Sequence, residues 1–285
     1  MVDMSHAHPA HAAHAAHVHA AHAAADLPAL LDLDAEVLGA YLPAVTAWTA
    51  EHVADVRTVV DLGAGTGVGA RALAEQFPEA TVLALERAPA MLARLEAILA
   101  GALAGRLEVV DADLDAAWPA LGPVDLVWAA SSLHEVTDPA RVLAQARDLL
   151  HPGGAVVVVE MDSLPWFLPD DVGAGRPGLE ARCHAALAAA GWNAVPDWAP
   201  VLTGAGLEVV ARRQFPVQVG PGAAHAEEYA RATLQHQRRA LDGVLAAADL
   251  AALDDLLADH GPDAVLAGER LTVHGSRVAW LARRP

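Results

Sequence analysis

The chain has 285 residues, of which 54% are hydrophobic, and it carries a formal charge of −18 at pH 7. This composition is typical of a well-packed globular protein and argues against a disordered one. The negative charge and the lack of a basic cluster argue against a nucleic-acid partner, because that mode of binding needs clustered Lys or Arg.

Cysteine content and apolar run lengths restrict the class further. Cys183 is the single cysteine, so neither a disulfide framework nor a cysteine-based zinc site is expected. Charged residues or glycine interrupt the apolar runs well short of membrane-spanning length, so we expect no membrane partner. The N-terminal residues lack the charged start and continuous apolar core of a secretory signal, and we therefore expect a cytoplasmic location.

Residues 1–25 are predicted to form a flexible tail rich in histidine and alanine. Seven of the 15 histidines lie within the first 22 residues. Imidazole is a common ligand of Zn²⁺ and Ni²⁺, so the tract is either a metal-binding tail or a low-complexity extension that binds metals only incidentally. We assign it neither a metal site nor a catalytic role.

The next segments predict a helical cap followed by alternating strands and helices. Apolar residues recur three and four apart in residues 26–56, which indicates helix. Short β-branched runs follow at 57–62, 80–85, 106–110, 124–129 and 155–160, separated by helical segments at 68–76, 88–100 and 139–150. Apolar strands that alternate with helices indicate a parallel sheet covered on both faces, which makes residues 57–162 a doubly wound α/β core.

Local signals mark two helix starts. Asp138 is expected to cap a helix that has Pro139 at its first position, and the HPGG segment at 151–154 is expected to end it. Asp249 is expected to cap the helix that runs through LAALDDLLADH.

The chain is less regular beyond residue 162. We predict a lid insertion at 163–196, a helix and sixth strand at 197–221, a helical insertion at 222–268 and a last strand at 269–285. The expected fold is therefore α/β, with a doubly wound, mostly parallel seven-stranded sheet and helical lid insertions.

The segment VVDLGAGTGVGA at 59–70 places a glycine-rich turn directly after the first strand. Ligands in open α/β sheets bind beyond the carboxyl ends of the strands, and glycines let a ligand approach the backbone closely. The GTGVGA part fits a dinucleotide fingerprint, so an NAD site is one alternative and a tight turn without a ligand is another. A P-loop is excluded because the chain has no lysine.

Five motifs in chain order resemble those of the class I S-adenosylmethionine-dependent methyltransferases. They are VVDLGAGTG, the acidic Glu86 that closes the second strand, VDADLDAAWP, SSLHEVTDPARVLAQARDLLHPGG and AVVVVE. The resemblance covers about residues 57–160 and is strongest to small-molecule methyltransferases that have a Leu-His motif after the fourth strand; the chain also looks like actinobacterial members of the class. It implies a Rossmann-like fold, S-adenosylmethionine as cofactor, and methyl transfer to an O, N or C atom of a small-molecule acceptor.

The resemblance also implies a set of cofactor-binding residues. Glu86 would accept both ribose hydroxyls, and Asp113, or Asp111 if the alignment slips by two, would take the adenine amino group. The set comprises Asp61, Gly63, Ala64, Gly65, Gly67, Glu86, Arg87, Met91, Asp111, Ala112, Asp113, Leu114, Ala130 and Ser131.

Within this set, Asp61 and the carbonyls of Gly63 and Gly65 would face the amino-acid end, with Ala130 or Ser131 closing over it. The backbone of Leu114 would lie near the adenine ring. An acidic site suits a cationic sulfonium better than a pyrophosphate. Alternatively, Asp61 only ties down the turn, and the loop acids are only solvated.

Catalysis would depend chiefly on holding the acceptor in line with the methyl group. A hydroxyl, phenol or ammonium acceptor also needs a general base, for which His134 is the first candidate. Glu160 is expected to face the same cleft as a base or a substrate anchor, with Glu135 a weaker candidate. The alternative for His134 is a structural histidine bonded to a neighbouring loop.

The lid region offers substrate clues with two interpretations. Its aromatic residues form an apolar acceptor pocket or simply dock the lid; they are Trp166, Phe167, Trp192 and Trp198. Arg176 and Arg182 would hold a carboxylate or phosphate if they point inward. The competing functions are an NAD-dependent oxidoreductase and a non-enzymatic protein that binds S-adenosylmethionine or metal. A homodimer is left open.

Overall fold

The computed structural model describes residues 27–99, 105–173, 175–192 and 197–285. The predicted histidine-rich tail lies outside these residues, as does a short part of the first predicted lid insertion. No helix within the described ranges is long and apolar enough to cross a membrane.

Seven strands form one sheet in the order β3-β2-β1-β4-β5-β7-β6. The first five strands are parallel, β7 is antiparallel to β5, and β6 is antiparallel to β7. This confirms the predicted doubly wound, mostly parallel seven-stranded sheet. The strands are β1 (Thr58–Leu62), β2 (Thr81–Glu86), β3 (Leu107–Asp111), β4 (Val124–Ala130), β5 (Leu150–Met161), β6 (Glu208–Val219) and β7 (Val273–Arg283).

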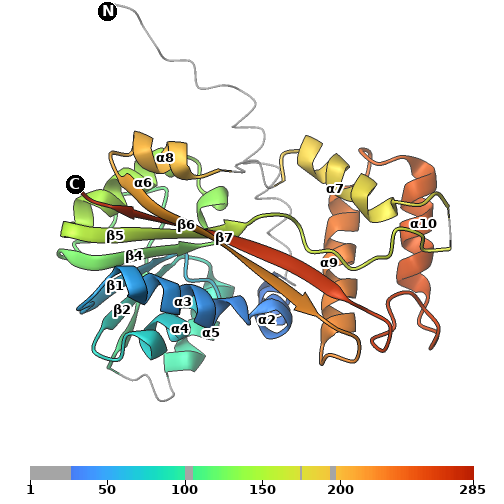
Figure 1. The fold of residues 1–285 in the computed structure, drawn as a ribbon, viewed down its shortest axis with the longest axis horizontal. Helices are drawn as coiled ribbons and strands as arrows, with labels where there is room; N and C mark the ends of the chain where they lie inside the picture. Colours follow the sequence, from blue (N-terminus) through green and yellow to red (C-terminus); the bar gives the residue numbers. More distant parts are fainter. Residues whose placement is uncertain (1–26, 100–104, 174, 193–196) are drawn as a thin grey trace, which may run out of the picture.

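Helices cover both faces of this sheet (Figure 1). One apolar core joins the sheet to α3 (Tyr41–His52), α4 (Val68–Gln76) and α5 (Pro89–Leu99). A second core on the other face joins it to α6 (Pro139–Leu149) and α8 (Ala199–Gly204). The central strands β1, β4 and the second half of β5 are therefore buried on both faces, which explains their continuous apolar runs, whereas the edge strand β6 is mostly exposed or half-buried.

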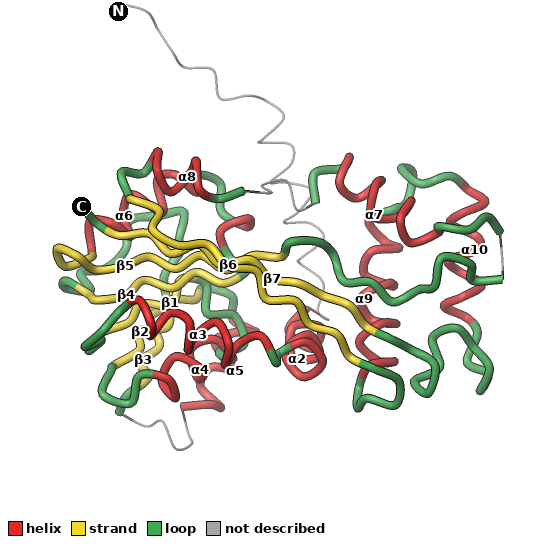
Figure 2. Tube along the Cα trace, viewed as in Figure 1, coloured by secondary structure: helices red, strands yellow, loops and turns green. Residues whose placement is uncertain are grey.

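A helical module lies beyond the sheet, at the right of Figure 1, and the long β6–β7 ribbon runs into it. It consists of α7 (Leu179–Ala189), α9 (Ala226–Ala240) and α10 (Ala247–Ala258), and α2 (Leu27–Leu38) packs on α9. Loops connect its helices (Figure 2), and a third apolar core holds it together. The two segments predicted as insertions therefore fold together.

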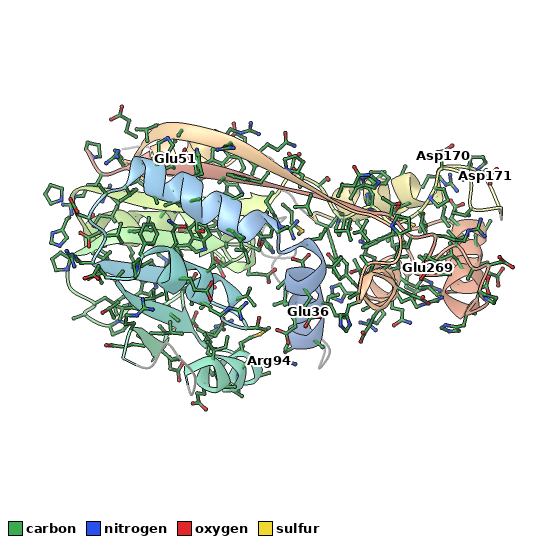
Figure 3. The ribbon with its side chains drawn as sticks, turned by 60° about the horizontal axis from the view of Figure 1, so that its bottom comes forward. Glu36, Glu51, Arg94, Asp170, Asp171 and Glu269 are labelled. Atoms are coloured by element: carbon green, nitrogen blue, oxygen red, sulfur yellow. The ribbon has the colours of Figure 1, made fainter. Side chains whose placement is uncertain are left out.

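Acidic side chains account for the high negative charge at the surface. Figure 3 shows exposed carboxylates at the periphery of both the sheet region and the helical module, namely Glu36, Glu51, Asp170, Asp171 and Glu269. Arg94, labelled in the same view, forms an ion pair with Asp32 of α2.

Helix capping confirms one prediction and corrects another. The side chain of Asp138 accepts a hydrogen bond from the backbone N–H of Arg141, and Pro139 opens α6, as expected. Asp249 does not cap α10, because Ala246 occupies the N-cap position. Instead Asp249 is buried in the first turn, where its carboxylate accepts hydrogen bonds from Arg182 and Arg176.

This ion pair also decides the placement of the two lid arginines. Arg182 binds both oxygens of Asp249 at 2.8 Å, so its guanidinium joins α7 to α10. The aromatic residues divide between roles: Trp198 is buried in the core of the sheet, Phe167 is buried in the module, and Trp166 is exposed.

Candidate active site

The carboxyl ends of the five parallel strands bring the predicted site residues to one edge of the sheet. Asp61 is the second-last residue of β1, in register with Trp128 of β4, and Glu86 ends β2 in register with Asp111 of β3. Glu160 lies at the end of β5. These residues are far apart in the chain and meet because parallel strands share an edge.

The glycine loop adopts left-handed conformations at Gly63, Gly65 and Gly67, with φ of 68°, 57° and 87°. A Cβ atom on Gly63 would lie 2.7 Å from the Cβ of Ser132, and one on Gly67 would lie 2.6 Å from Leu95. A Cβ on Gly65 would meet nothing closer than 4.0 Å. Packing therefore requires two of the glycines, whereas at Gly65 a side chain would meet no close neighbour and only the positive φ favours glycine.

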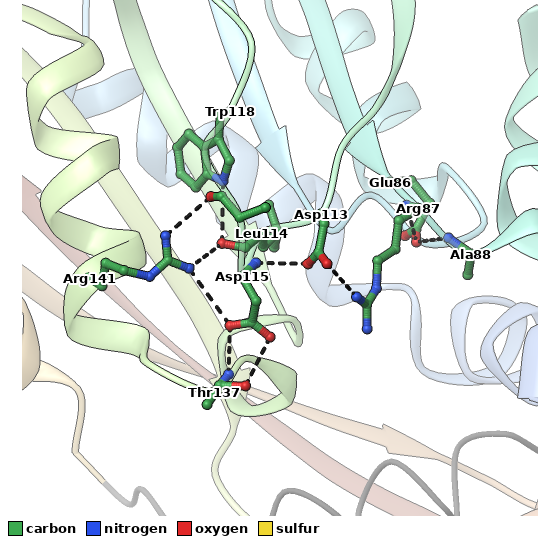
Figure 4. Close-up of polar contacts among 10 residues, drawn as sticks. Glu86, Arg87, Ala88, Asp113, Leu114, Asp115, Trp118, Thr137 and Arg141 are labelled. Carbon is green, nitrogen blue, oxygen red and sulfur yellow. Dashed lines mark hydrogen bonds and ion pairs between the residues drawn. The ribbon is translucent and has the colours of Figure 1, made fainter. Parts of the chain in front are cut away.

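Glu86 is held rigidly beneath this loop. Its Oε2 accepts a hydrogen bond from the N–H of Gly65 at 2.9 Å, and its Oε1 accepts from the N–H groups of Arg87 and Ala88 at 2.8 Å (Figure 4). A carboxylate oxygen accepts more than one hydrogen bond, so both oxygens retain capacity for the adjacent hydroxyls of a ribose.

Asp113 forms an ion pair with Arg87, the residue that follows Glu86, and sequence reasoning missed this pair. Its Oδ2 is 2.7 Å from Nη1 of Arg87, and its Oδ1 accepts from the N–H of Asp115 at 2.9 Å (Figure 4). Asp111 is exposed at the end of β3. Arg87 directly follows Glu86, the last residue of β2. A basic residue at this position was the sequence signal that could have predicted the ion pair with Asp113.

Leu114 borders the glycine loop through its side chain, which would contact a Cβ on Gly63 at 3.6 Å. Its carbonyl accepts a hydrogen bond from Nη2 of Arg141 at 2.7 Å. This contact ties the loop after β3 to α6 and fixes the backbone that was predicted to face an adenine ring. Of the remaining predicted residues, Ala64, Met91 and Ala112 are buried around this loop.

Asp61 is a buried carboxylate with unused hydrogen-bonding capacity. Only 2% of the residue is exposed, and its Oδ2 has no hydrogen-bond partner within the described part of the chain. Burial, with a smaller contribution from the charge of Glu86, raises the pKa of Asp61 to about 7. An unpaired buried carboxylate below a glycine loop suits an ammonium group, which would supply both charge and hydrogen bonds.

The turn after β4 is strained at Ser131, which has φ of 52° although it is not glycine. Its N–H donates to the carbonyl of Val159 at 2.8 Å, which ties the ends of β4 and β5 together. Backbone strain of this kind occurs mainly at ligand-binding and catalytic positions. Ala130 precedes it as the last residue of β4.

His134 lies between two carboxylates. Its Nδ1 is 2.8 Å from Oε2 of Glu160, and its Nε2 is 3.0 Å from Oε1 of Glu135. Burial lowers the pKa of His134, but the charge of Glu160 and the hydrogen bonds to both carboxylates outweigh it, so the pKa rises to about 10. Glu160 itself is buried, and its Oε1 has no hydrogen-bond partner among the described residues.

A short 3₁₀ segment positions this histidine. It lies in the 3₁₀ segment Leu133–Glu135, where Leu133 is buried in the core and anchors the segment to the sheet. Three or more potential metal ligands do not cluster anywhere in the described ranges.

Comparison with known proteins agrees with this arrangement. A family described as a methyltransferase domain matches residues 59–154. Trans-aconitate 2-methyltransferase of Acidovorax sp. (strain JS42) is 35% identical over 108 residues, a match that covers 38% of this chain and 40% of that protein. The trans-aconitate 2-methyltransferase of Methylobacterium nodulans is 30% identical over 233 residues, covering 79% of this chain and 86% of the relative. The chain belongs to the class I S-adenosylmethionine-dependent methyltransferases.

Solved structures with methyltransferase descriptions share the fold. A structure from Anaeromyxobacter dehalogenans that is described as a type II methyltransferase matches with a TM-score of 0.56 at 20% identity. The match covers 85% of this chain and 96% of that one. A structure from Bacillus halodurans C-125 that is described as a methyltransferase matches with a TM-score of 0.52 at 17% identity. The match covers 85% of this chain and 98% of that one. Membership of this methyltransferase class makes S-adenosylmethionine the methyl donor, and nothing in the comparisons supports the NAD-dependent or non-enzymatic alternatives.

Proposed function

We propose that the protein transfers a methyl group from S-adenosylmethionine to a small-molecule acceptor. The chain spans only about 40% of the length of several relatives, such as the Acidovorax protein. These matches show the family of the chain, and the substrate is part of the proposal. The observation that carries the proposal is the adjacency of the glycine loop, the rigid Glu86 and the His134–Glu160 pair at one sheet edge.

The cofactor is held in two parts. Glu86 binds the ribose hydroxyls, and Asp113 with the backbone of Leu114 faces the adenine. Asp61 binds the amino group at the other end, and Ser131 closes over it. The unused Oδ2 of Asp61 and the strain at Ser131 support this assignment.

Bound S-adenosylmethionine supplies a methyl group on a sulfonium, which is electrophilic enough to be attacked directly. Glu160 orients His134 through Nδ1, in the way that a buried carboxylate orients a catalytic histidine. With a hydroxyl acceptor, Nε2 of His134, once released from Glu135, would take the acceptor proton as a general base; with a carboxylate acceptor, which has no proton to lose, His134 would only orient the attacking oxygen. In either case that oxygen forms the new C–O bond while the S–CH₃ bond breaks. The products are the methylated acceptor and S-adenosylhomocysteine.

Relatives suggest an oxygen acceptor. Their names specify methyl transfer to trans-aconitate, and to malonyl-[acyl-carrier protein] for an O-methyltransferase of Laribacter hongkongensis that is 36% identical over 109 residues. Both acceptors carry carboxylate groups. We infer oxygen methylation of a small molecule in the cytoplasm, with the helices α7, α9 and α10 acting as the lid that excludes water. A homodimer remains compatible with this proposal.

Calorimetric titration tests the cofactor. S-adenosylhomocysteine should bind the full chain, NAD⁺ should not, and Glu86→Ala should weaken S-adenosylhomocysteine binding by about 10-fold or more because charge-assisted hydrogen bonds contribute about 1.5–3 kcal/mol. Glu75→Ala, an exposed residue of α4, is the matched control and should bind as the wild type does. Binding of NAD⁺ alone would overturn the proposal.

A second experiment tests the chemistry. Trans-aconitate is offered with S-adenosylmethionine, and mass spectrometry follows a gain of one methyl group. Product from the wild type supports oxygen methylation. The carboxylates of trans-aconitate carry no proton at neutral pH, so a lower rate in His134→Gln with this acceptor would report a role of His134 in orienting the acceptor and not in removing a proton. If S-adenosylhomocysteine binds but trans-aconitate is not methylated, the cofactor assignment stands and this acceptor is rejected.

A further inference from the structure

Arg277 lies on β7 close to the proposed catalytic pair. Its Cα is in register with Met161 of β5, and the next residue, Val278, is in register with Glu160. Only 3% of Arg277 is exposed. The buried guanidinium is therefore attached one residue along the sheet from Glu160, and its side chain lies on the opposite face because successive residues of a strand alternate between faces.

The hydrogen bonds of this guanidinium are incomplete. Nη2 contacts both oxygens of Asp34 at 2.9 Å, so the ion pair uses one nitrogen instead of two. Nη1 is 3.4 Å from the carbonyl of Ser276, and the guanidinium also forms a hydrogen bond with the side chain of Tyr41. Nε has no partner in the described part of the chain. Buried donors are almost always paired in proteins because an unpaired one costs free energy, so a partner for Nε is expected.

Two buried tyrosines complete the surroundings. The guanidinium lies 5.2 Å from the ring centroid of Tyr41, and the hydroxyl of Tyr229 donates to Asp34 at 2.6 Å. Burial raises the pKa of both tyrosines, so both stay neutral. The charge of Glu160 also contributes to the raised pKa of Tyr41.

We propose that Arg277 anchors a carboxylate of the methyl acceptor through its Nε–H and Nη1–H groups. The inference rests on the proposed function and deepens it by naming the class of acceptor, a carboxylate-bearing small molecule. The free groups of Arg277 are all donors, so they require acceptor oxygens. A carboxylate provides two such oxygens with the planar geometry that suits a guanidinium.

Asp34 limits the strength of this anchor. Its negative charge lies against the same guanidinium, so it competes with an incoming anion while holding the arginine in place. Replacing Asp34 by Asn keeps a hydrogen-bond acceptor for Nη2 and removes the competing charge. A binding site and a purely structural ion pair therefore differ in their response to Asp34→Asn.

The test uses acetate and its neutral counterpart acetamide as probes. The full chain is labelled with ¹⁵N-arginine, and the Nε–H signal of Arg277, assigned by its loss in Arg277→Lys, is followed with and without S-adenosylhomocysteine. Acetate should shift this signal and acetamide should not. Asp34→Asn should bind acetate about 10-fold more tightly, a change of about 1.4 kcal/mol. Arg212→Lys, an exposed arginine on β6, is the control and should leave acetate binding unchanged.

An Arg277 signal that ignores acetate, responds equally to acetamide, or gains no affinity in Asp34→Asn would overturn the inference. If Arg277→Lys does not fold, the Asp34→Asn titration still decides between the outcomes. S-adenosylhomocysteine binding is measured on the same samples, so the two proposals fail separately. Acetate binding without S-adenosylhomocysteine binding would overturn the proposed methyl transfer alone, whereas the reverse result would overturn the Arg277 anchor alone.

Discussion

The Nδ1 atom of His134 lies 2.8 Å from Oε2 of Glu160, although 26 residues separate them in the chain. The histidine follows β4 and the glutamate ends β5, so two neighbouring parallel strands bring them together. Glu160 is almost fully buried, whereas 29% of the His134 side chain is exposed. A buried carboxylate therefore holds a histidine that has access to a ligand.

Loss of the hydrogen-bonded pair His134 and Glu160 should lower the rate of methyl transfer without weakening cofactor binding. His134→Gln should reduce kcat by about 10²–10⁴-fold, the usual contribution of a general base. Glu160→Gln should give a smaller reduction because the imidazole remains but is no longer oriented by a charge. Steady-state kinetics and calorimetry with S-adenosylhomocysteine check both. An unchanged kcat in His134→Gln would leave the histidine with a structural role only.

The pH dependence of the rate should report the raised pKa of His134. A base must be deprotonated, so kcat should rise with pH towards about 10, the pKa set by the balance of burial against the two carboxylates. Glu135→Gln removes one hydrogen-bonded carboxylate and should move the profile to lower pH. A flat profile in the wild type would show that the acceptor loses no proton to His134.

The raised pKa of His134 should also make the free energy of unfolding depend on pH. The pKa of His134 is higher in the folded chain than its ordinary 6.5, so its contribution is complete below about pH 6.5 and is lost as the pH rises through about 10.

Gly63 should tolerate no side chain. Gly63→Ala combines a positive φ with a Cβ 2.7 Å from that of Ser132, so we expect a loss of about 2–4 kcal/mol in the free energy of unfolding. Gly153→Ala is the matched control, because Gly153 has φ of 81° but a Cβ there would meet nothing within 4 Å. It should lose about 1–2 kcal/mol. Urea denaturation measures both, and equal losses would contradict the role given to Ser132.

Glu180 should make the helical module more stable at mildly acidic pH. Burial raises its pKa to about 7, although the N–H groups of Leu168 and Phe167 that bind its carboxylate oppose the shift. The folded chain therefore holds a proton that the unfolded chain releases above about 4.5, so this contribution is complete below pH 4.5 and is lost as the pH rises through about 7.

Glu180→Gln should remove that dependence, which amounts to about 3 kcal/mol between the two limits. Thermal unfolding of both proteins from pH 5 to pH 8 measures it. If the two proteins show parallel pH curves, Glu180 is ionised throughout and its burial is compensated by the backbone donors.

Local patterns in the chain were enough to predict the sheet and one edge of the site. Apolar runs indicated the strands, and Asp138 with Pro139 marked the start of α6. The glycine loop and Glu86 were identified because their spacing reflects a strand, a tight turn and the next strand, which are short-range features. The expectation that His134 and Glu160 face the same cleft used, in addition, the resemblance to the methyltransferase family, and the structure brings the two side chains within hydrogen-bonding distance.

Contacts between distant segments depended on the folded chain. Asp249 has the sequence of a helix cap, yet it pairs with Arg182 of another helix, 67 residues away. Arg277 and Asp34 are separated by 243 residues and meet only because the β6–β7 ribbon runs past α2 and α9. The periodicity of apolar residues indicates which face of each helix or strand is apolar. A charged pair as far apart in the chain as Arg277 and Asp34 depends instead on how these faces pack against one another, and that packing involves the whole chain.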